Sequence, residues 1–268
     1  MKLKALFSLI LVLLACKTAF AGNAVNQLNV DLSPSLYTTQ DVEDGIDLTA
    51  EMTFPLGPIV GVGVLADIGM AYGKDDYLDS VYSALGAQIF FGSHDIGRIG
   101  FGFLSDSKVY SEEDSYYGDD DTTVSSDSTL KYAEAYLGDF TLGISGSNVE
   151  PEAESGGYTA EQPEHEITMY TLQYYPTDNV RLELSQYTEE IDDGATYYFY
   201  PGYVIVFEDT EIKANTLGLE FGVTSMVSIF MEYANIQSNN DKDVKSYSVG
   251  ATIYFRGGDT LKDNDRWY

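Results

Sequence analysis

The sequence predicts an all-β protein: an antiparallel up-and-down transmembrane β-barrel of about twelve strands, with short turns at one end and long acidic loops at the other. Three observations predict this fold. An export signal occupies the amino terminus, apolar and polar residues alternate through most of the remaining chain, and the connections between the alternating segments are short and long in turn.

The export signal comes first. Two lysines precede an apolar run over residues 5–15, and the Ala-Phe-Ala that ends at Ala21 supplies the small residues that signal peptidase recognises. We therefore expect a signal peptide over residues 1–21. The Leu-Leu-Ala-Cys ending at Cys16 offers an alternative, a lipoprotein box in which the only cysteine carries a lipid anchor. Cleavage after Ala21 instead leaves a chain with no cysteine and no disulfide.

The composition excludes several classes of protein. The chain has 14 Lys and Arg residues against 43 Asp and Glu residues, a net charge of −29 at pH 7. Nucleic acid is not expected as a partner, because phosphate contacts need clustered cations. The 44% of hydrophobic and 13% of aromatic residues do not fit a disordered acidic chain. Beyond the export signal, no stretch approaches the roughly 18 apolar residues of a membrane-spanning helix.

Residues 45–73 show the alternation most clearly. Apolar side chains such as Ile46 and Leu48 alternate there with the carboxylates Asp47 and Glu51. In lipid, only helices and closed barrels satisfy every backbone hydrogen bond, so we expect the apolar face to contact lipid and the polar face to line a wet lumen. A soluble two-sheet sandwich also alternates and is the alternative. Strands of roughly 9–11 residues suit a tilted span, and aromatic residues gather at strand ends, which favours the barrel.

The strands are expected in order along the chain, with tight turns after the even-numbered ones and mostly longer connections after the odd-numbered ones. The expected strands are residues 26–38, 45–56, 59–73, 80–92, 98–110, 128–138, 139–149, 166–175, 180–190, 211–223, 226–237 and 244–255. The long connections include residues 111–127, 150–165 and 191–210, whereas the tight ones lie around Gly57-Pro58 and Gly138-Asp139. Short periplasmic turns and long extracellular loops are typical of barrels in a bilayer. The barrel is therefore expected to occupy residues 22–255.

Aromatic residues are expected to form two belts at the membrane surfaces, where an amphipathic ring lies among lipid headgroups. The belt near the short turns would contain Phe54, Phe91, Phe140, Tyr174 and Phe255. The belt near the long loops would contain Tyr37, Tyr72, Tyr187, Tyr233 and Tyr247.

The final strand, "YSVGATIYF" over residues 247–255, carries a family resemblance. With polar Ser248, Gly250, apolar Ile253 and aromatic Phe255, it resembles the terminal β-signal of Gram-negative outer-membrane proteins. In most such barrels the aromatic residue is the last one, whereas here "RGGDTLKDNDRWY" follows. We therefore expect residues 256–268 to form a polar periplasmic tail.

In size and topology the chain is similar to small twelve-stranded porin-like channels of that class. The resemblance implies contacts with outer-membrane lipid and lipopolysaccharide, insertion by barrel-assembly machinery, and passage of small solutes. Channels of this class for acidic sugars carry tracks of arginine inside, a pattern that this chain does not match. The sequence does not distinguish a monomer from a trimer.

The side chains expected on the inner wall make it acidic. They are Asp31, Asp47, Glu51, Asp67, Glu134, Glu183, Glu220 and Glu232, with Arg98 and Arg181 as the cations. This balance predicts a pore that concentrates cations and repels anions. The alternative is a sealed barrel in which each arginine bridges two acids. Inward glycines, among them Gly69, Gly100 and Gly143, either leave space along the wall or let strands bend.

The sequence thus predicts an outer-membrane porin-like channel for passive diffusion of small, preferably cationic or neutral solutes, without enzymatic activity. One alternative is a sealed structural or adhesive barrel whose tyrosine-rich loops bind a partner; residues 191–210 could fold inward or extend as a hairpin. A surface hydrolase would need a catalytic histidine, yet His94 is expected in a tight turn and His165 among acids. The acidic loops lack the spacing of a calcium loop, so no metal and no cofactor are predicted.

Overall fold

The computed structural model describes residues 29–57, 59–74, 79–93, 96–111, 122–155, 158–191, 196–198, 204–206, 210–239, 243–255 and 260–262. The expected signal peptide with Cys16, His94, most of the acidic loop 111–127 and most of the carboxy-terminal tail lie outside these residues. Within the described part of the chain, no helix is long and apolar enough to cross a membrane.

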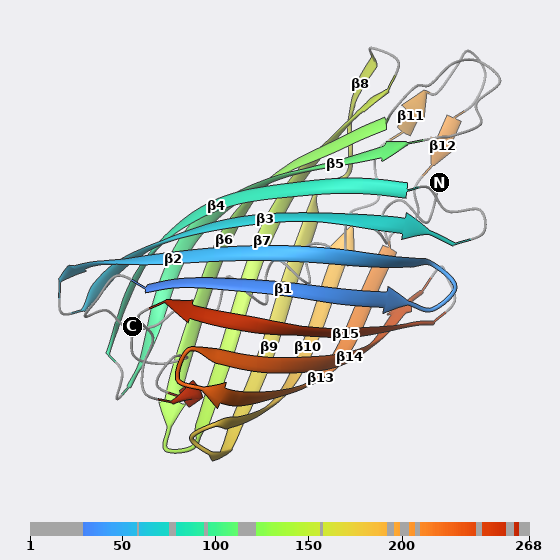
Figure 1. Cartoon of the computed structure of the whole chain (residues 1–268). Coiled ribbons are helices and arrows are strands. Elements are labelled where there is room, and N and C mark those ends of the chain that lie inside the picture. Colours follow the sequence, from blue (N-terminus) through green and yellow to red (C-terminus); the bar gives the residue numbers. More distant parts are fainter. Residues whose placement is uncertain are drawn as a thin grey trace.

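Twelve long antiparallel strands close into a barrel (Figure 1), which confirms the predicted fold class. Consecutive strands pair around the ring, and pairing of the first strand with the last closes it. The barrel strands are β1 (Asn29–Thr39), β2 (Glu43–Gly57), β3 (Val60–Gly73), β4 (Asp79–Ser93), β5 (Gly97–Ser111), β6 (Thr122–Leu137), β7 (Phe140–Ser155), β9 (His165–Thr177), β10 (Val180–Ile191), β13 (Thr210–Thr224), β14 (Val227–Ser238) and β15 (Val244–Phe255). We call the end with the tight β6–β7 and β9–β10 turns the short-turn end, and the opposite end the long-loop end.

Three further short strands lie at the long-loop end. β8 (Tyr158–Glu161) pairs with the end of β7. β11 (Thr196–Tyr198) and β12 (Val204–Val206) pair with each other as a separate antiparallel hairpin, which lies beyond the end of β5 in Figure 1. The described parts of residues 191–210 thus pair with each other as two short strands; Pro201-Gly202 lies outside the described residues.

Strands β6 and β7 continue farther toward the long-loop end than the sequence indicated. Their pairing runs from Leu137 and Phe140 at the tight turn to Thr122 and Ser155 at the other end. The first half of β6 is rich in serine and threonine and has little apolar alternation, so it resembles a loop in the sequence. Backbone pairing continues there without a lipid-facing apolar stripe.

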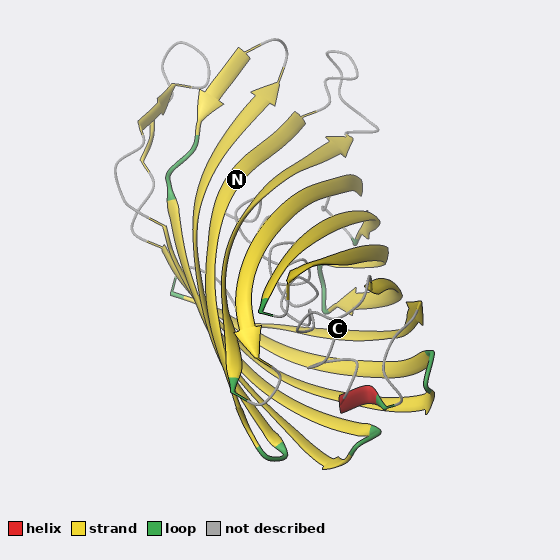
Figure 2. Ribbon diagram, turned by 90° about the vertical axis from the view of Figure 1, so that its left-hand side faces the viewer, coloured by secondary structure: helices red, strands yellow, loops and turns green. Residues whose placement is uncertain are grey.

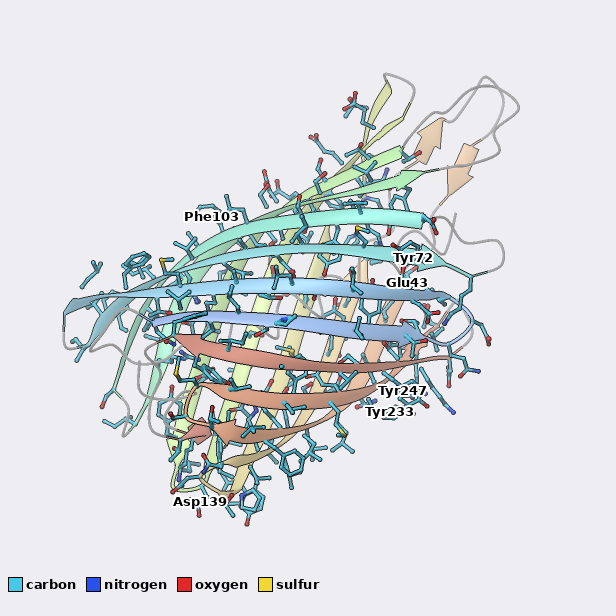
Figure 3. All side chains as sticks on the ribbon, viewed as in Figure 1. Glu43, Tyr72, Phe103, Asp139, Tyr233 and Tyr247 are labelled. Carbon is cyan, nitrogen blue, oxygen red and sulfur yellow. The ribbon has the colours of Figure 1, made fainter. Side chains whose placement is uncertain are left out.

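The outer face of the barrel is apolar, as the alternation predicts. In β3, residues from Val64 to Met70 alternate between exposed apolar side chains and buried inward positions. Large outward side chains continue around the other strands and include Leu85, Phe103, Ile144, Leu184, Leu217 and Val249. Figure 3 shows this coat of side chains, with Phe103 and Tyr247 labelled. Such a surface suits contact with lipid.

The aromatic belts are partly as expected. At the short-turn end, the five predicted aromatic residues are exposed on the outer face, and Phe140 stacks on Tyr174 with ring centroids 4.8 Å apart. At the long-loop end, Tyr72 and Tyr247 are exposed, but Tyr37 and Tyr187 are buried inside the barrel. The assignment of these two tyrosines to the belt was therefore wrong, because each occupies an inward position of its strand.

Several inward glycines accommodate aromatic rings from the neighbouring strand. Tyr82 lies opposite Gly69, and a Cβ at position 69 would come within 2.2 Å of its ring. Tyr132 covers Gly100 in the same way, at 2.3 Å. These two glycines do not leave open space along the wall, as one interpretation of the sequence had it. Instead they let a tyrosine ring lie flat against the sheet.

The described part of the tail folds back onto the short-turn end. Leu261 is only 2% exposed, and its backbone N–H donates to Asn179 Oδ1 at 3.3 Å. Lys262 Nζ contacts Asp139 at 2.8 Å and Asp178 at 3.8 Å. This helical stretch, red in Figure 2, connects the tail to the β6–β7 and β9–β10 turns.

Candidate functional site: the inner wall

The charged side chains predicted for the inner wall come from eight strands and all point into the barrel. Asp47, Glu51, Asp67, Arg98, Glu183 and Glu220 are buried, and Asp31, Glu134, Arg181 and Glu232 are half-buried. Strand register places several of them directly opposite one another. Asp31 faces Glu51, Arg98 faces Glu134, and Arg181 faces Glu220. The wall has three charged regions: one around Arg98, one around Arg181, and one on β2 and β3.

The first region joins β5 to β6. The guanidinium of Arg98 donates from Nε to Glu134 Oε2 at 2.8 Å and from Nη2 to Oε1 at 2.9 Å. Tyr136 donates to the same carboxylate at 3.1 Å. The rings of Phe90 and Tyr132 lie 5.9 and 5.6 Å from the guanidinium carbon. A bidentate pair between aromatic faces fixes both side chains, so Arg98 neutralises Glu134 at a fixed position on the wall.

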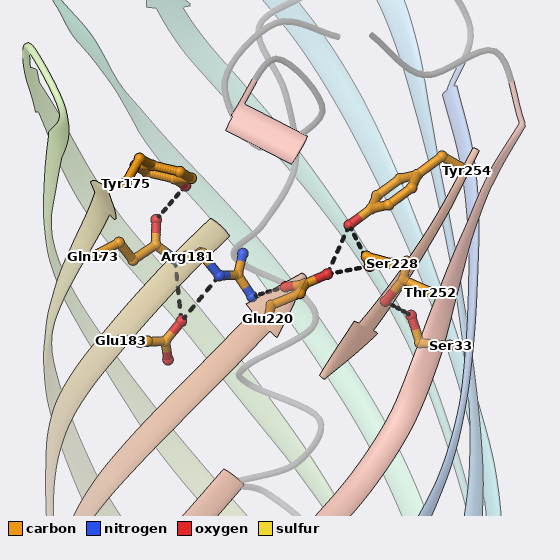
Figure 4. A network of polar contacts seen from close by, with 9 residues as sticks. All are labelled: Ser33, Gln173, Tyr175, Arg181, Glu183, Glu220, Ser228, Thr252 and Tyr254. Carbon is orange, nitrogen blue, oxygen red and sulfur yellow. Dashed lines mark hydrogen bonds and ion pairs between the residues drawn. The ribbon is translucent and has the colours of Figure 1, made fainter. Parts of the chain in front are cut away.

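The second region surrounds Arg181 (Figure 4). Arg181 Nη2 lies 2.6 Å from Glu220 Oε2, and its Nε lies 3.9 Å from Glu183 Oε2. Glu220 also accepts hydrogen bonds from Ser228 and from Tyr254, the latter at 3.1 Å. Arg181 thus bridges two acids, as the sealed-barrel alternative expected.

A chain of side-chain hydrogen bonds extends the Arg181 region along the wall. Tyr175 donates to Gln173 Oε1 and Gln173 donates to Glu183 Oε2, each at 3.2 Å. A polar cavity of about 40 Å³ lies between this region and the Arg98 region, lined among others by Glu134, Thr141, Gln173, Arg181 and Glu183. A cavity of this size and polarity has room for water.

The third region, on β2 and β3, has a different charge balance. Asp47, Glu51 and Asp67 are 7%, 7% and 3% exposed. Thr49 donates to Asp67 at 3.3 Å, and Gln88 lies 3.4 Å from Glu51. Within the described residues, no lysine or arginine forms an ion pair with Asp47, Glu51 or Asp67. This part of the wall is therefore richer in acids than in bases.

The structure adds four inward charged residues that the sequence analysis missed: Glu43, Asp106, Lys108 and Glu189. Asp106 accepts a hydrogen bond from Ser126 at 2.7 Å. Asp106 and Lys108 share the even-numbered positions of Arg98 in β5, and Glu189 shares the odd-numbered positions of Arg181 in β10. Consistent use of strand parity would have found these three. Glu43 lies before the expected start of its strand.

His165 begins β9 and points into the barrel. Its Nδ1 lies 2.5 Å from Glu189 Oε1 on the neighbouring strand, and Tyr187 donates to Glu189 Oε2 at 3.1 Å. The imidazole is 9% exposed. Its partner is a carboxylate, and it is not placed beside a serine nucleophile in the hydrogen bonds of the described residues.

The predicted β-signal residues lie along the closing strand β15. Ser248 points inward and donates to Glu232 Oε2 at 3.2 Å. Gly250 also points inward, where a Cβ would meet the ring of Phe230 and the backbone oxygen of Pro34, each at 2.5 Å. Phe255 is exposed on the outer face. Recognition of these residues by assembly machinery stays a prediction.

Comparison with known proteins identifies the fold. No protein-family model matches the sequence, and no curated protein matches it significantly. The translocator domain of the autotransporter NalP from Neisseria meningitidis matches with a TM-score of 0.64 and 12% identity, over 94% of this chain and 97% of that one. The KdgM porin in complex with disordered oligogalacturonate matches with a TM-score of 0.54 and 10% identity, over 84% and 99%. The fold is that of an outer-membrane β-barrel.

A mutant of the TodX monoaromatic hydrocarbon channel also resembles this barrel, with a TM-score of 0.53 and 8% identity over 88% of this chain and 93% of that one. At these identities the likeness concerns the fold alone. Outer-membrane barrels of this kind thus include a translocator domain, a porin and a hydrocarbon channel.

Proposed function

We propose that this outer-membrane barrel is a channel for passive diffusion of small solutes, with a preference for cationic or neutral ones. The short turns would face the periplasm and the long loops the exterior, which is the usual orientation of such barrels. The channel would need no cofactor and would catalyse no reaction. Solutes would be selected by the diameter and charge of the wall.

The cluster of inward carboxyl groups on β2 and β3 carries this proposal. Asp47, Glu51 and Asp67 lie on adjacent strands, point inward, and form no ion pair with a described lysine or arginine. Fixed negative charge beside a low-dielectric wall raises the local concentration of cations and opposes anions. The same charge argues against an acidic solute, although one similar structure is that of a porin in complex with disordered oligogalacturonate.

The test is the reversal potential of the refolded protein in a planar lipid bilayer under a KCl gradient. We expect conducting steps with a cation-selective potential, and we expect Glu51→Gln to move the potential toward zero. A unit charge about 8 Å from a passing ion contributes about 0.5 kcal/mol in water, so the permeability ratio should fall roughly twofold.

Glu166→Gln is the matched control. Glu166 lies on β9 with an exposed side chain on the outer face, so the substitution removes the same charge without changing the inner wall. An anion-selective wild type, or equal shifts from the two variants, would contradict the proposed selectivity. Folded protein without conductance would favour the sealed structural or adhesive barrel.

A further inference from the structure

Near the long-loop end, the inner wall carries an apolar cluster. Inward side chains from five strands, β7, β9, β10, β13 and β14, pack into one cluster there. Its members are Val149, Ile167, Tyr187, Ile191, Ile212, Ala214 and Ile236, with Ala234 and Val244 packed against them. Buried charged side chains, among them Lys108, His165 and Glu189, lie at the same end, so the cluster is an apolar patch within a mixed wall.

A second apolar cluster at the same end crosses the barrel. Val42, on the β1–β2 turn, packs against Tyr110 of β5, and both are buried. Val124 of β6 and Val244 of β15 pack against this pair. In the ring, β6 and β15 are separated by β1 to β5 on one side and by β7, β9, β10, β13 and β14 on the other. Side chains from opposite walls therefore meet the same pair, which places Val42 over the lumen.

The β1–β2 turn is held in this position by backbone hydrogen bonds on both sides. Asp41 has a φ of 58°, and Val42 N–H donates to Thr39 O at 3.2 Å, which closes the turn tightly. Gln40 N–H donates to Lys245 O at 2.8 Å, and Lys74 N–H donates to Val42 O at 2.7 Å. The turn is thus joined to β15 and to the segment after β3, and Val42 is fixed in place.

We propose that Val42 and Tyr110 form an apolar constriction across the long-loop mouth that selects solutes before they reach the acidic wall. This inference rests on the proposed channel function and names its solute class: small neutral or cationic molecules that carry an apolar face. Val42, Val124 and Val244 offer a strongly hydrated ion no polar group in place of its water, so such an ion passes poorly, since apolar narrowings exclude water. A weakly hydrated cation gives up its water more readily and packs against the valines, while the Tyr110 ring has Lys108 Nζ 5.1 Å from its centroid.

The experiment compares Val42→Thr with Val42→Ala in single-channel recordings. Threonine keeps the shape of valine and adds a hydroxyl, whereas alanine widens the site without adding polarity. We expect Val42→Thr to raise the potassium conductance on the order of a few-fold and to exceed Val42→Ala. Val64→Thr makes the same change on the outer face, where Val64 is exposed, and should leave the conductance unchanged.

A second readout uses tetramethylammonium as a weakly hydrated cation. With tetramethylammonium on one side of the bilayer and potassium on the other, we expect the permeability ratio of tetramethylammonium to potassium to fall in Val42→Thr. A conducting wild type with unchanged conductance and ratio in Val42→Thr would overturn the constriction and leave the channel intact. If potassium conductance rises in Val42→Ala but not in Val42→Thr, the width of the site and not its polarity limits passage, which would overturn an apolar constriction. If the wild type and every variant are folded but do not conduct, the channel and the constriction are both overturned.

Discussion

Arg98 shows how the barrel accommodates a charge on its inner wall. Its side chain is almost fully buried, with a carboxylate in its plane and aromatic rings at cation–π distances. Removing an ion from water costs several kcal/mol, and the bidentate pair with Glu134 offsets that cost only while both partners are present. The pair is thus sensitive to loss of one partner.

We therefore expect Arg98→Met to lower the free energy of unfolding by about 3 kcal/mol, because it leaves the Glu134 carboxylate without its guanidinium. The measurement is urea-induced unfolding of the refolded barrel in lipid vesicles. The double variant Arg98→Met with Glu134→Gln removes both charges and should recover much of the loss. A double variant as unstable as the single one would mean that Arg98 acts through packing on the rings instead of through the ion pair.

The positions of individual side chains follow from strand parity, where the sequence is informative. The alternation places Asp47, Glu51 and Asp67 inward, and the structure has them there. Tyr37 shares the parity of Asp31, and Tyr187 shares that of Arg181, so parity would have placed both inside as well. They were assigned to a belt because of residue type and chain position. Where residue type and strand parity disagree, strand parity determines whether the side chain faces the lumen or the outside.

At the scale of strand pairs, glycine opposite an aromatic residue is a recurring unit of this barrel. Beyond the pairs at Gly69 and Gly100, Tyr37 lies opposite Gly45, and Phe230 lies opposite Gly250. In both, a Cβ on the glycine would collide with the ring, at 2.3 and 2.5 Å. A ring lying over a glycine buries backbone and fills the interior without widening the sheet.

This geometry predicts that Gly69→Ala destabilises the barrel by about 1–3 kcal/mol, because the Tyr82 ring must move or the strands must separate. Gly143→Ala is the matched control, since its Cβ would meet Thr171 at an ordinary contact distance of 3.5 Å. Urea unfolding of the two variants measures the difference. Equal effects would show that loss of glycine flexibility, and not collision with the ring, determines the cost.

The β1–β2 turn illustrates what the sequence does not reveal about an element. Nothing in the alternation indicates that Val42 reaches across the mouth to Tyr110. That direction depends on the left-handed backbone of Asp41 and on hydrogen bonds to Lys74 and Lys245, which are distant in sequence. Turn direction is set by such neighbours, so local residue types predicted the turn and not its position over the lumen.

At the scale of the whole molecule, the carboxy-terminal tail packs against the short-turn end of a barrel that is already closed by strand pairing. Deleting residues 256–268 removes the buried Leu261 and the contacts of Lys262 with two exposed aspartates. We expect the truncated chain to fold and to lose about 2 kcal/mol of unfolding free energy, most of it from Leu261. Heat-dependent migration in SDS gels shows whether the truncated chain folds, and urea unfolding measures its free energy of unfolding.

Lys262→Ala alone should cost less than about 1 kcal/mol, because its partners are largely exposed. A truncated chain that fails to fold would assign the tail a role in closing the barrel. The number and order of strands were predictable without the tail, since alternating segments and alternating turn lengths define an up-and-down ring. The return of the tail to the β9–β10 turn could not be predicted, because its polar sequence has no periodic pattern.

The seam between β1 and β15 has a consequence for how the chain reaches its folded state. It joins residues 219 positions apart, such as Ser33 and Thr252, so it can form only after the last strand exists. Until then β1 is a sheet edge, open to pairing with other chains. β1 pairs with β15 from Val30 to Leu32 and from Ser35 to Thr39, and Pro34 lies in the gap. Because proline has no backbone N–H to donate, Pro34 limits pairing of this exposed edge with other chains before β15 is available.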